Sequence, residues 1–281
     1  MVYNNNFKYI SLVQLALKED LGKKDITTQL LIPKDKTVRV ILLAKQDLVA
    51  CGLQFAREAF TLTDSNIKFI PLVKEGEQVK KGKILARIQG KACSILTAER
   101  VALNFLSLMS AITTKTRKFT QAVKPYKTRI VDTRKTIPGL RLLQKYAVRI
   151  GGGFNHRFSL DEMIMVKDNH LHILGSYRNM KKLDNRYKVE LEVDNLKQFK
   201  EALELKPDII MLDNMPVKDI KKAVVLRNSL KKSRQPAPQL ESSGGITLKN
   251  IRKIASTGVD MISIGGLTHS IDSVDISLEI I

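Results

Sequence analysis

The alternation of apolar and polar positions changes character about halfway along the chain. Before residue 128, strand-like and helix-like stretches follow one another without a fixed order. After it, short apolar runs alternate regularly with amphipathic stretches. A period of about two residues indicates a strand and one of about 3.6 residues indicates a helix. The chain is therefore expected to contain two different kinds of α/β structure.

The part before residue 128 begins with a predicted helix and continues with predicted strands. SLVQLALKEDLG (11–22) has the spacing of a short amphipathic helix, and strands are expected in VRVILLAKQDLVA (38–50) and NIKFIPLV (66–73). Gly76 and Gly82 predict hairpin turns within the stretch VKEGEQVKKGKILARIQG (73–90). This stretch is somewhat like half of a biotinyl or lipoyl sandwich. It has no modifiable lysine in a matching turn, so it is interpreted as structural.

A longer helix is expected next, in AERVALNFLSLMSAITTKTRKFTQAVK (98–124), because its apolar residues recur at helical spacing. Thr97 is the predicted N-cap, and Arg100 then falls in the first turn.

The part after residue 128 alternates strands with helices. Parallel strands joined by right-handed crossovers are the usual outcome of such a pattern. A β/α barrel is favoured over a doubly wound sheet, because no GxGxxG or GxxxxGK[ST] motif follows any of the strands. The expected strands are TRIVDT (128–133), KVELEVD (188–194), DIIMLDN (208–214), PQLESSGG (238–245) and VDMISIGG (259–266), with helices in the intervals that follow the first four.

The ends of these strands are unusually polar and rich in glycine. In a β/α barrel the reactive residues lie at the carboxyl ends of the strands. Here those ends comprise residues 132–135, 192–194, 213–214, 243–245 and 264–266. This concentration is the strongest indication of a functional site that the residues themselves provide.

Acidic residues on two of the strands are expected to face the barrel interior. Strand alternation places Glu190 and Glu192 on one face and Leu191 and Val193 on the other, which the helices must cover. Met211 and Asp213 are expected to point inward as well. Three interpretations remain open: buried ion pairs, ligands for Mg²⁺, and stabilisation of a positively charged sugar carbon.

Cations and glycines gather around the same strand ends. The stretch 132–157 contains Arg134, Lys135, Arg141, Lys145, Arg149, Arg157 and three consecutive glycines. Glycine pairs follow the last two strands, where barrels commonly bind phosphate through backbone N–H groups, although plain turns would look the same. Arginine matches carboxylate and phosphate in bidentate fashion. These residues predict a site for a phosphorylated sugar and a second, carboxylated anion.

Composition limits the remaining possibilities. Cys51 and Cys93 are the only cysteines, which indicates two buried thiols rather than a disulfide framework or a metal cluster. No signal peptide is recognised at the start, and no run of roughly 18 apolar residues is present, so a cytoplasmic protein is expected. The net charge of +20 raises nucleic acid as a partner. The cations are spread along the chain and aromatic residues make up only 5%, so a solubilising surface is the preferred interpretation.

Taken in order, the motifs TAER, DTRKTIPGLR, GGGFNHR, VKDNH, ELEVDN, IMLDN, ESSGGI and LTHS resemble the quinolinate phosphoribosyltransferase family over essentially the whole chain. The resemblance implies an N-terminal α/β sandwich (1–112, with 272–281 returning to it) and an open β/α barrel (113–271). It implies that, with Mg²⁺ as cofactor, quinolinate reacts with phosphoribosyl pyrophosphate to give nicotinate mononucleotide, pyrophosphate and CO2.

The resemblance also implies roles for individual residues. It places Arg134, His156, Arg157 and Lys167 on the quinolinate carboxylates, Lys135 near the pyridine and the phosphoribosyl donor, and Thr133 among the substrate-binding residues. The implied catalytic residues are Lys135, Glu192 and Asp213. Glu192 and Asp213 would face the ribose and Mg²⁺. Arg100 would reach the site of a neighbouring subunit, so that a homodimer is the minimal active unit. The residues implied for the sugar phosphate are Ser243, Gly244, Gly245, Ile264, Gly265 and Gly266.

Some features depart from the family pattern or lack a role. Lys24 replaces a usual glycine, and Ala111 and Thr113 differ from the common form of their motif, which affects subunit packing at most. Arg141, Lys145 and Arg149 are interpreted either as helix-surface residues or as indirect partners of the site. The alternatives to the transferase are a molybdenum-transport-associated paralogue of the same fold and a basic barrel that binds nucleic acid.

Overall fold

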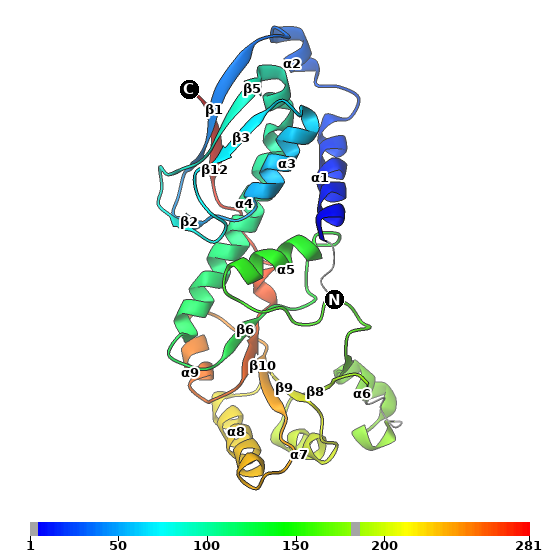
Figure 1. Ribbon diagram of the computed structural model, residues 1–281. Helices are drawn as coiled ribbons and strands as arrows, with labels where there is room; N and C mark the ends of the chain where they lie inside the picture. The colour runs from blue at the N-terminus through cyan, green and yellow to red at the C-terminus, as the bar shows by residue number, and fades with distance from the viewer. Residues whose placement is uncertain (1–4, 181–185) are drawn as a thin grey trace. The chain divides into compact units, whose positions relative to one another are not determined.

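The computed structural model describes residues 5–180 and 186–281, which form two compact units (Figure 1). The first unit consists of the described residues up to Lys115, Leu142–Gly151 and Ile271–Ile281. The second consists of Thr116–Arg141 and Gly152–Ser270. The sequence placed 113–271 in the barrel, whereas here residues 142–151 group with the first unit.

The first unit is built on an antiparallel sheet of four strands, in the order β12-β1-β5-β3. These are β12 (Ile276–Ile280), β1 (Thr37–Ala44), β5 (Ile84–Lys91) and β3 (Lys68–Pro71). Val40 in the middle of β1 pairs with Ile280 on one side and Ile88 on the other. The short strands β2 (Leu48–Val49) and β4 (Gln78–Val79) pair separately. The turns predicted at the two glycines are present, since Gly76 and Gly82 have φ of 82° and 86°.

Helices accompany this sheet. They are α1 (Asn5–Leu21), α2 (Ile26–Leu31), α3 (Leu53–Thr63), α4 (Ala92–Val123) and, from a later part of the chain, α5 (Arg141–Ile150). In Figure 1, α3 runs beside β3, and α1 lies next to α3. Phe55 and Phe60 of α3 are fully buried, so this helix contributes large side chains to the core of the unit.

The prediction that Thr97 caps the long helix is wrong. The helix α4 begins at Ala92, directly after the last residue of β5, so Thr97 lies inside it. The Thr97 hydroxyl instead donates a hydrogen bond of 3.1 Å to Asp25, which is the N-cap of α2. Because the helix continues from a strand without a loop, the usual capping signal marked a position within it.

The helix α4 bears on the expectation that no stretch of the chain spans a membrane. Among the described residues it is long and apolar enough, by length and composition, to cross a membrane. However, 61% of its apolar window is buried within the protein, which is what a core helix shows. The expectation about cysteines holds for Cys51, which is fully buried, but Cys93 is only half-buried.

The second unit contains a parallel sheet of six strands in the order β6-β11-β10-β9-β8-β7. Their bounds are β6 (Arg129–Val131), β7 (Ile164–Val166), β8 (Val189–Val193), β9 (Ile209–Asp213), β10 (Gln239–Ser243) and β11 (Met261–Ser263). No pairing joins the two edge strands, β6 and β7, within the described part of the chain. This is the open β/α barrel that the sequence predicted.

The helices α7 (Leu196–Glu204), α8 (Val217–Lys232) and α9 (Ile251–Ala255) follow β8, β9 and β10, as expected. They lie on the outside of the strands (Figure 1). The strand β7, the helix α6 (Asp168–Leu174) and the short 3-10 helices η1 (Tyr177–Asn179) and η2 (Gly265–Leu267) were not predicted. A strand of three residues is too short to show a clear period.

Candidate functional site

The carboxyl ends of the barrel strands surround a cavity of about 460 Å³. Many of the side chains that line it were predicted from the sequence, namely Thr133, Arg134, Lys135, His156, Arg157, Lys167, Glu192, Asp213 and Ser243. Others were not in the predicted set, namely Met165, Asp168, Met211, Glu241 and Ser263. Most lining residues come from the six strands or from the loops that follow them, whereas His156 and Arg157 lie between α5 and β7. All of them lie in the second unit.

Not every predicted residue lines the cavity. Gly244 and Gly245 follow Ser243, and residues 264–266 follow Ser263, so both glycine turns begin at lining residues without lining the cavity themselves. Arg100 is exposed on α4 and belongs to the first unit.

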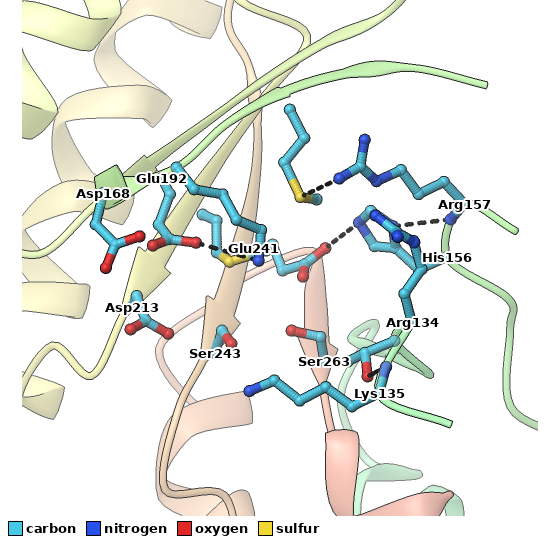
Figure 2. A pocket seen from close by; sticks show the side chains of 14 residues that line it. Arg134, Lys135, His156, Arg157, Asp168, Glu192, Asp213, Glu241, Ser243 and Ser263 are labelled. Carbon is cyan, nitrogen blue, oxygen red and sulfur yellow. Dashed lines mark hydrogen bonds and ion pairs between the residues drawn. The ribbon is translucent and has the colours of Figure 1, made fainter. Parts of the chain in front are cut away.

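The cavity has a cationic side and an acidic side. In Figure 2, Arg134, His156 and Arg157 gather on one side, and Asp168, Glu192 and Asp213 on the other. This separation places groups of opposite charge on facing sides of the cavity, whereas the sequence suggested acids between the cations and a phosphate site.

His156 is held firmly on the cationic side. Its Nε2 lies 3.0 Å from Glu190 and 3.4 Å from Glu241, both of which are fully buried. Its backbone N–H donates to the buried Asp132 at a distance of 2.9 Å. The inward direction predicted for Glu190 is thus confirmed, and the interpretation of a buried ion pair applies to this acid.

Arg157 follows His156 and turns toward β7. Its guanidinium donates to the carbonyl of Met163 at 3.0 Å and contacts the sulfur of Met165 at 3.3 Å. Burial lowers the pKa of Arg157, the neighbouring Arg134 lowers it further, and Glu190 opposes both effects. Two guanidinium groups that repel each other in this way favour the approach of an anion between them.

The acidic side is more open to solvent. Lys167 lies 3.7 Å from Glu192, with side-chain exposures of 41% and 13%. Burial raises the pKa of Glu192, Lys167 opposes that shift, and Asp213 adds to it. The hydroxyl of Tyr177, on η1, donates to the backbone carbonyl of Glu192 at 2.5 Å and so ties the segment after α6 to the end of β8.

The basic loop 133–141 is held in place by its own polar contacts. The backbone N–H of Lys135 donates to Thr133, and the hydroxyl of Thr268 donates to the Lys135 carbonyl at 2.7 Å. Arg141, which had no assigned role, donates to Thr136 and to the carbonyl of Phe158. It therefore joins the two loops that carry the cations, as an indirect partner of the site.

The other two unassigned cations differ from each other. Arg149 is exposed near the end of α5, so a helix-surface position describes it. Lys145 is fully buried, so for this residue the helix-surface interpretation is wrong.

The three consecutive glycines turn the chain and do not line the cavity. Gly152 has a φ of 90°, in the left-handed region that favours glycine. Phe154 then runs alongside β6, where its N–H donates to Ile130 at 2.8 Å and its carbonyl accepts from Asp132 at 3.1 Å. The glycines therefore serve to bring residues 155–157 back to the strand end.

The glycine turn after β10 has a steric reason of its own. A Cβ on Gly244 would lie 2.1 Å from the side-chain oxygen of Asn214. Asn214 itself has a φ of 51°, and its amide donates to the Asp213 carboxylate at 2.7 Å. Glycine at position 244 thus leaves room for a side chain that orients Asp213. In the next turn, a Cβ on Gly265 would approach Lys135 and His269 to 3.1 Å.

Among the residues missed from the sequence, Glu241 is the most informative. It lies two positions before Ser243 on the same face of β10, so strand alternation contains a signal for it. Asp168 follows Lys167 at the start of α6, an element that the sequence pattern did not reveal.

Comparison with known proteins agrees with this geometry. Residues 112–279 match the family model "Quinolinate phosphoribosyl transferase, C-terminal domain", and residues 25–110 match the N-terminal domain of the same family. A curated relative from Methanocaldococcus jannaschii, named probable nicotinate-nucleotide pyrophosphorylase [carboxylating], is 40% identical over 97% of this chain and 97% of its own length.

Further relatives give the same result. A Bacillus subtilis protein with the same name is 36% identical over 98% of this chain and 94% of its own length. The solved structure of the nicotinate-nucleotide pyrophosphorylase from Francisella tularensis superposes with a TM-score of 0.89 at 40% identity, covering 98% of this chain and 96% of that one. The chain therefore belongs to the quinolinate phosphoribosyl transferase family.

Proposed function

We propose that this protein transfers the phosphoribosyl group of phosphoribosyl pyrophosphate to quinolinate and removes one carboxylate, giving nicotinate mononucleotide, pyrophosphate and CO2. The observation that carries the proposal is the cavity in which Arg134 and Arg157 lie opposite Glu192 and Asp213, with Lys167 beside Glu192. The relatives named above carry the name of this activity. None of them supports the molybdenum-associated or nucleic-acid-binding alternative.

The cationic side is suited to a dicarboxylate. Arg134 and Arg157 offer planar pairs of donors, and Lys167 adds a point charge. His156 lies between these groups and the buried acids, and Thr133 and Lys135 complete the loop beside them. We assign the quinolinate carboxylates to Arg134, His156, Arg157 and Lys167.

The opposite side is suited to the sugar phosphate. We propose that Glu192 and Asp213, which line the cavity, face the ribose. The turns at residues 243–245 and 264–266 follow lining strands, and their backbone N–H groups are the expected phosphate donors. Ser243 adds a hydroxyl to the cavity wall.

The residues present also fit a magnesium ion. Asp168, Glu192 and Asp213 line the cavity together, and Mg²⁺ prefers a few carboxylate oxygens together with substrate phosphates and water. We propose Glu192 and Asp213 as the residues that hold it, directly or through water. When bound, the ion neutralises charge on the departing pyrophosphate.

The reaction needs no protein nucleophile. With its carboxylates fixed, quinolinate presents its ring nitrogen to the anomeric carbon, and the nitrogen forms a bond to that carbon as the bond to pyrophosphate breaks. Glu192 and Asp213 stabilise the positive charge that develops on the sugar. When the adjacent carboxylate leaves as CO2, the electron pair of the broken bond stays on the ring carbon, where the positively charged ring nitrogen stabilises it. A proton then adds to that carbon in place of the carboxylate.

The proposal includes a homodimer. Arg100 on α4 is exposed in the single chain. A residue that contacts another subunit has to be exposed in this way. We propose that it completes the site of a partner copy, and that the enzyme acts in the cytoplasm. Gel filtration and mixing of an Arg100→Ala chain with a chain inactivated at Arg134 test this, because one intact site should re-form in the mixed dimer.

The decisive experiment for the function is quinolinate-dependent release of CO2 by purified protein with phosphoribosyl pyrophosphate and Mg²⁺. Nicotinate in place of quinolinate is expected to give no product, because it lacks the second carboxylate. Rapid turnover of nicotinate without CO2 would rule out the assignment. Binding to nucleic acid with a steep dependence on salt, in the absence of CO2 release, would favour the nucleic-acid alternative.

A further inference from the structure

Two glutamates that contact His156 have no role in the proposed reaction. Glu190 on β8 and Glu241 on β10 are both fully buried. Apart from their ion pairs with His156, the carboxylate oxygens have no hydrogen-bond partner among the described residues. A buried carboxylate is costly unless a positive charge or several donors compensate it. The pair therefore requires a partner that remains in place when no substrate is bound.

His156 is that partner. Its Nε2 lies between the two acids, at 3.0 Å from Glu190 and 3.4 Å from Glu241. Burial lowers the pKa of His156, but the contacts with the two glutamates outweigh this effect and raise the pKa to about 10. The imidazole is then positively charged at neutral pH and compensates one of the two negative charges, while burial and the neighbouring Glu241 raise the pKa of Glu190.

The second ring nitrogen has a different neighbour. The backbone N–H of Arg157 lies 2.8 Å from Nδ1, a contact that a neutral imidazole would accept. The chain places this amide beside the ring because the two residues are adjacent, whereas the two acids come from separate strands. Leaving two buried carboxylates without a nearby positive charge costs more free energy than losing one hydrogen bond between neighbouring residues. We therefore assign the charged form to the His156 imidazole.

We propose that Glu190 and Glu241 are positioning residues, which hold the His156 imidazole through Nε2 in one orientation, while His156 compensates their negative charge. Glu190 also offsets the effect of burial and of Arg134 on Arg157. The two acids thus fix the cationic side before an anion arrives. The effect on quinolinate rests on the proposed function, but the mutual dependence of the three side chains does not.

Stability measurements test that dependence without any substrate. His156→Gln leaves two buried carboxylates uncompensated and is expected to lower the Tm by roughly 5–15 °C. The triple variant H156Q/E190Q/E241Q removes the charges together and should recover most of the loss. The matched control is His172→Gln, because His172 is exposed on α6 and should leave the Tm unchanged. A stable H156Q variant, or a triple variant no more stable than H156Q, would overturn the proposal.

A second measurement uses the unmodified protein, in case a variant fails to fold. The chain has four histidines, so nitrogen NMR of the imidazole rings can follow each one. At pH 8, His156 should give the signals of an imidazolium, and a neutral His156 at that pH contradicts the assignment. The same trio could hold a divalent cation. Stoichiometric metal in the purified protein that is lost in H156Q would replace our reading with a metal site.

Kinetics separate positioning from a purely structural role. Glu190→Gln and Glu241→Gln are each expected to raise the KM for quinolinate about tenfold, since the orientation of His156 is lost. The KM for phosphoribosyl pyrophosphate should not change. A rise in that KM instead, with quinolinate unaffected, would exclude the positioning role. If the wild type releases no CO2, the proposed function fails, while the Tm and NMR results still decide the present inference.

Discussion

The charged side chains on the two sides of the cavity differ in how they are paired before a ligand binds. On the cationic side, His156 is already paired with two fully buried glutamates, and its backbone is held by the buried Asp132. On the acidic side, Glu192 lies 3.7 Å from Lys167, and both side chains retain access to solvent. One side is preassembled, whereas the other leaves its carboxylates available to a ligand.

This difference indicates that the two sides bind different kinds of ligand group. Preassembled donors bind an anion without a large cost of reordering, as a rigid dicarboxylate requires. Partly solvated carboxylates can exchange water and counterions, as a charged leaving group with a metal ion requires. Substitutions on the cationic side should therefore affect both stability and ligand binding. Substitutions on the acidic side should affect mainly ligand binding.

The largest effect should appear in the pH dependence of stability. The pKa of His156 is about 10 in the folded protein and about 6.5 when unfolded. A raised folded pKa gives stability that is fully present below about pH 6.5 and is lost as the pH rises toward 10. Denaturant unfolding across this range should show the loss in the wild type and a much flatter profile in H156Q/E190Q/E241Q. Identical profiles would mean that the cationic side is not preassembled.

The next largest effect is expected on quinolinate binding by Arg134, which lines the cavity on its cationic side. Arg134→Ala should weaken quinolinate binding by about 2–5 kcal/mol, because a desolvated charged contact is lost. Isothermal titration gives the Kd directly, with phosphoribosyl pyrophosphate as the control ligand. An unchanged quinolinate Kd would remove Arg134 from the binding set.

A smaller effect is expected at the turn beside Asp213. Gly244→Ala should cost about 1–3 kcal/mol of unfolding free energy, because alanine is strained at a φ of 85° and its Cβ displaces Asn214. Gly245→Ala is the comparison, since its φ is 60° and nothing lies within 4 Å of its Cβ. The extra cost at position 244 should disappear in the background of Asn214→Gly. Equal costs at the two positions would show that Asn214 is not the reason for the glycine.

The smallest effect is expected for the exposed pair on the acidic side. A double-mutant cycle of Lys167→Met and Glu192→Gln should give a coupling in stability below about 1 kcal/mol, because the pair is partly solvated. A coupling of several kcal/mol would contradict the contrast between the two sides.

The sequence predicted the barrel because the strand ends and the helices after them follow regular periods. It also placed Glu190 and Glu192 on the inner face, since alternation alone decides that. It could not show that His156, from a loop, meets acids from two other strands, because such contacts depend on the order of strands in the sheet. It missed β7 and α6, which are too short to show a period, and it assigned the three glycines near residue 152 to an anion when they turn the chain.

The antiparallel sheet has a consequence for the biogenesis of the protein. Its strand β1 pairs with β12, the last strand of the described chain, so that Val40 meets Ile280. On a ribosome, β1 leaves the exit tunnel long before its partner exists, and until then one of its edges exposes unpaired backbone groups. Completion of this sheet must therefore wait until β12 has been synthesised, and a chain stalled shortly before β12 would present an aggregation-prone edge to chaperones.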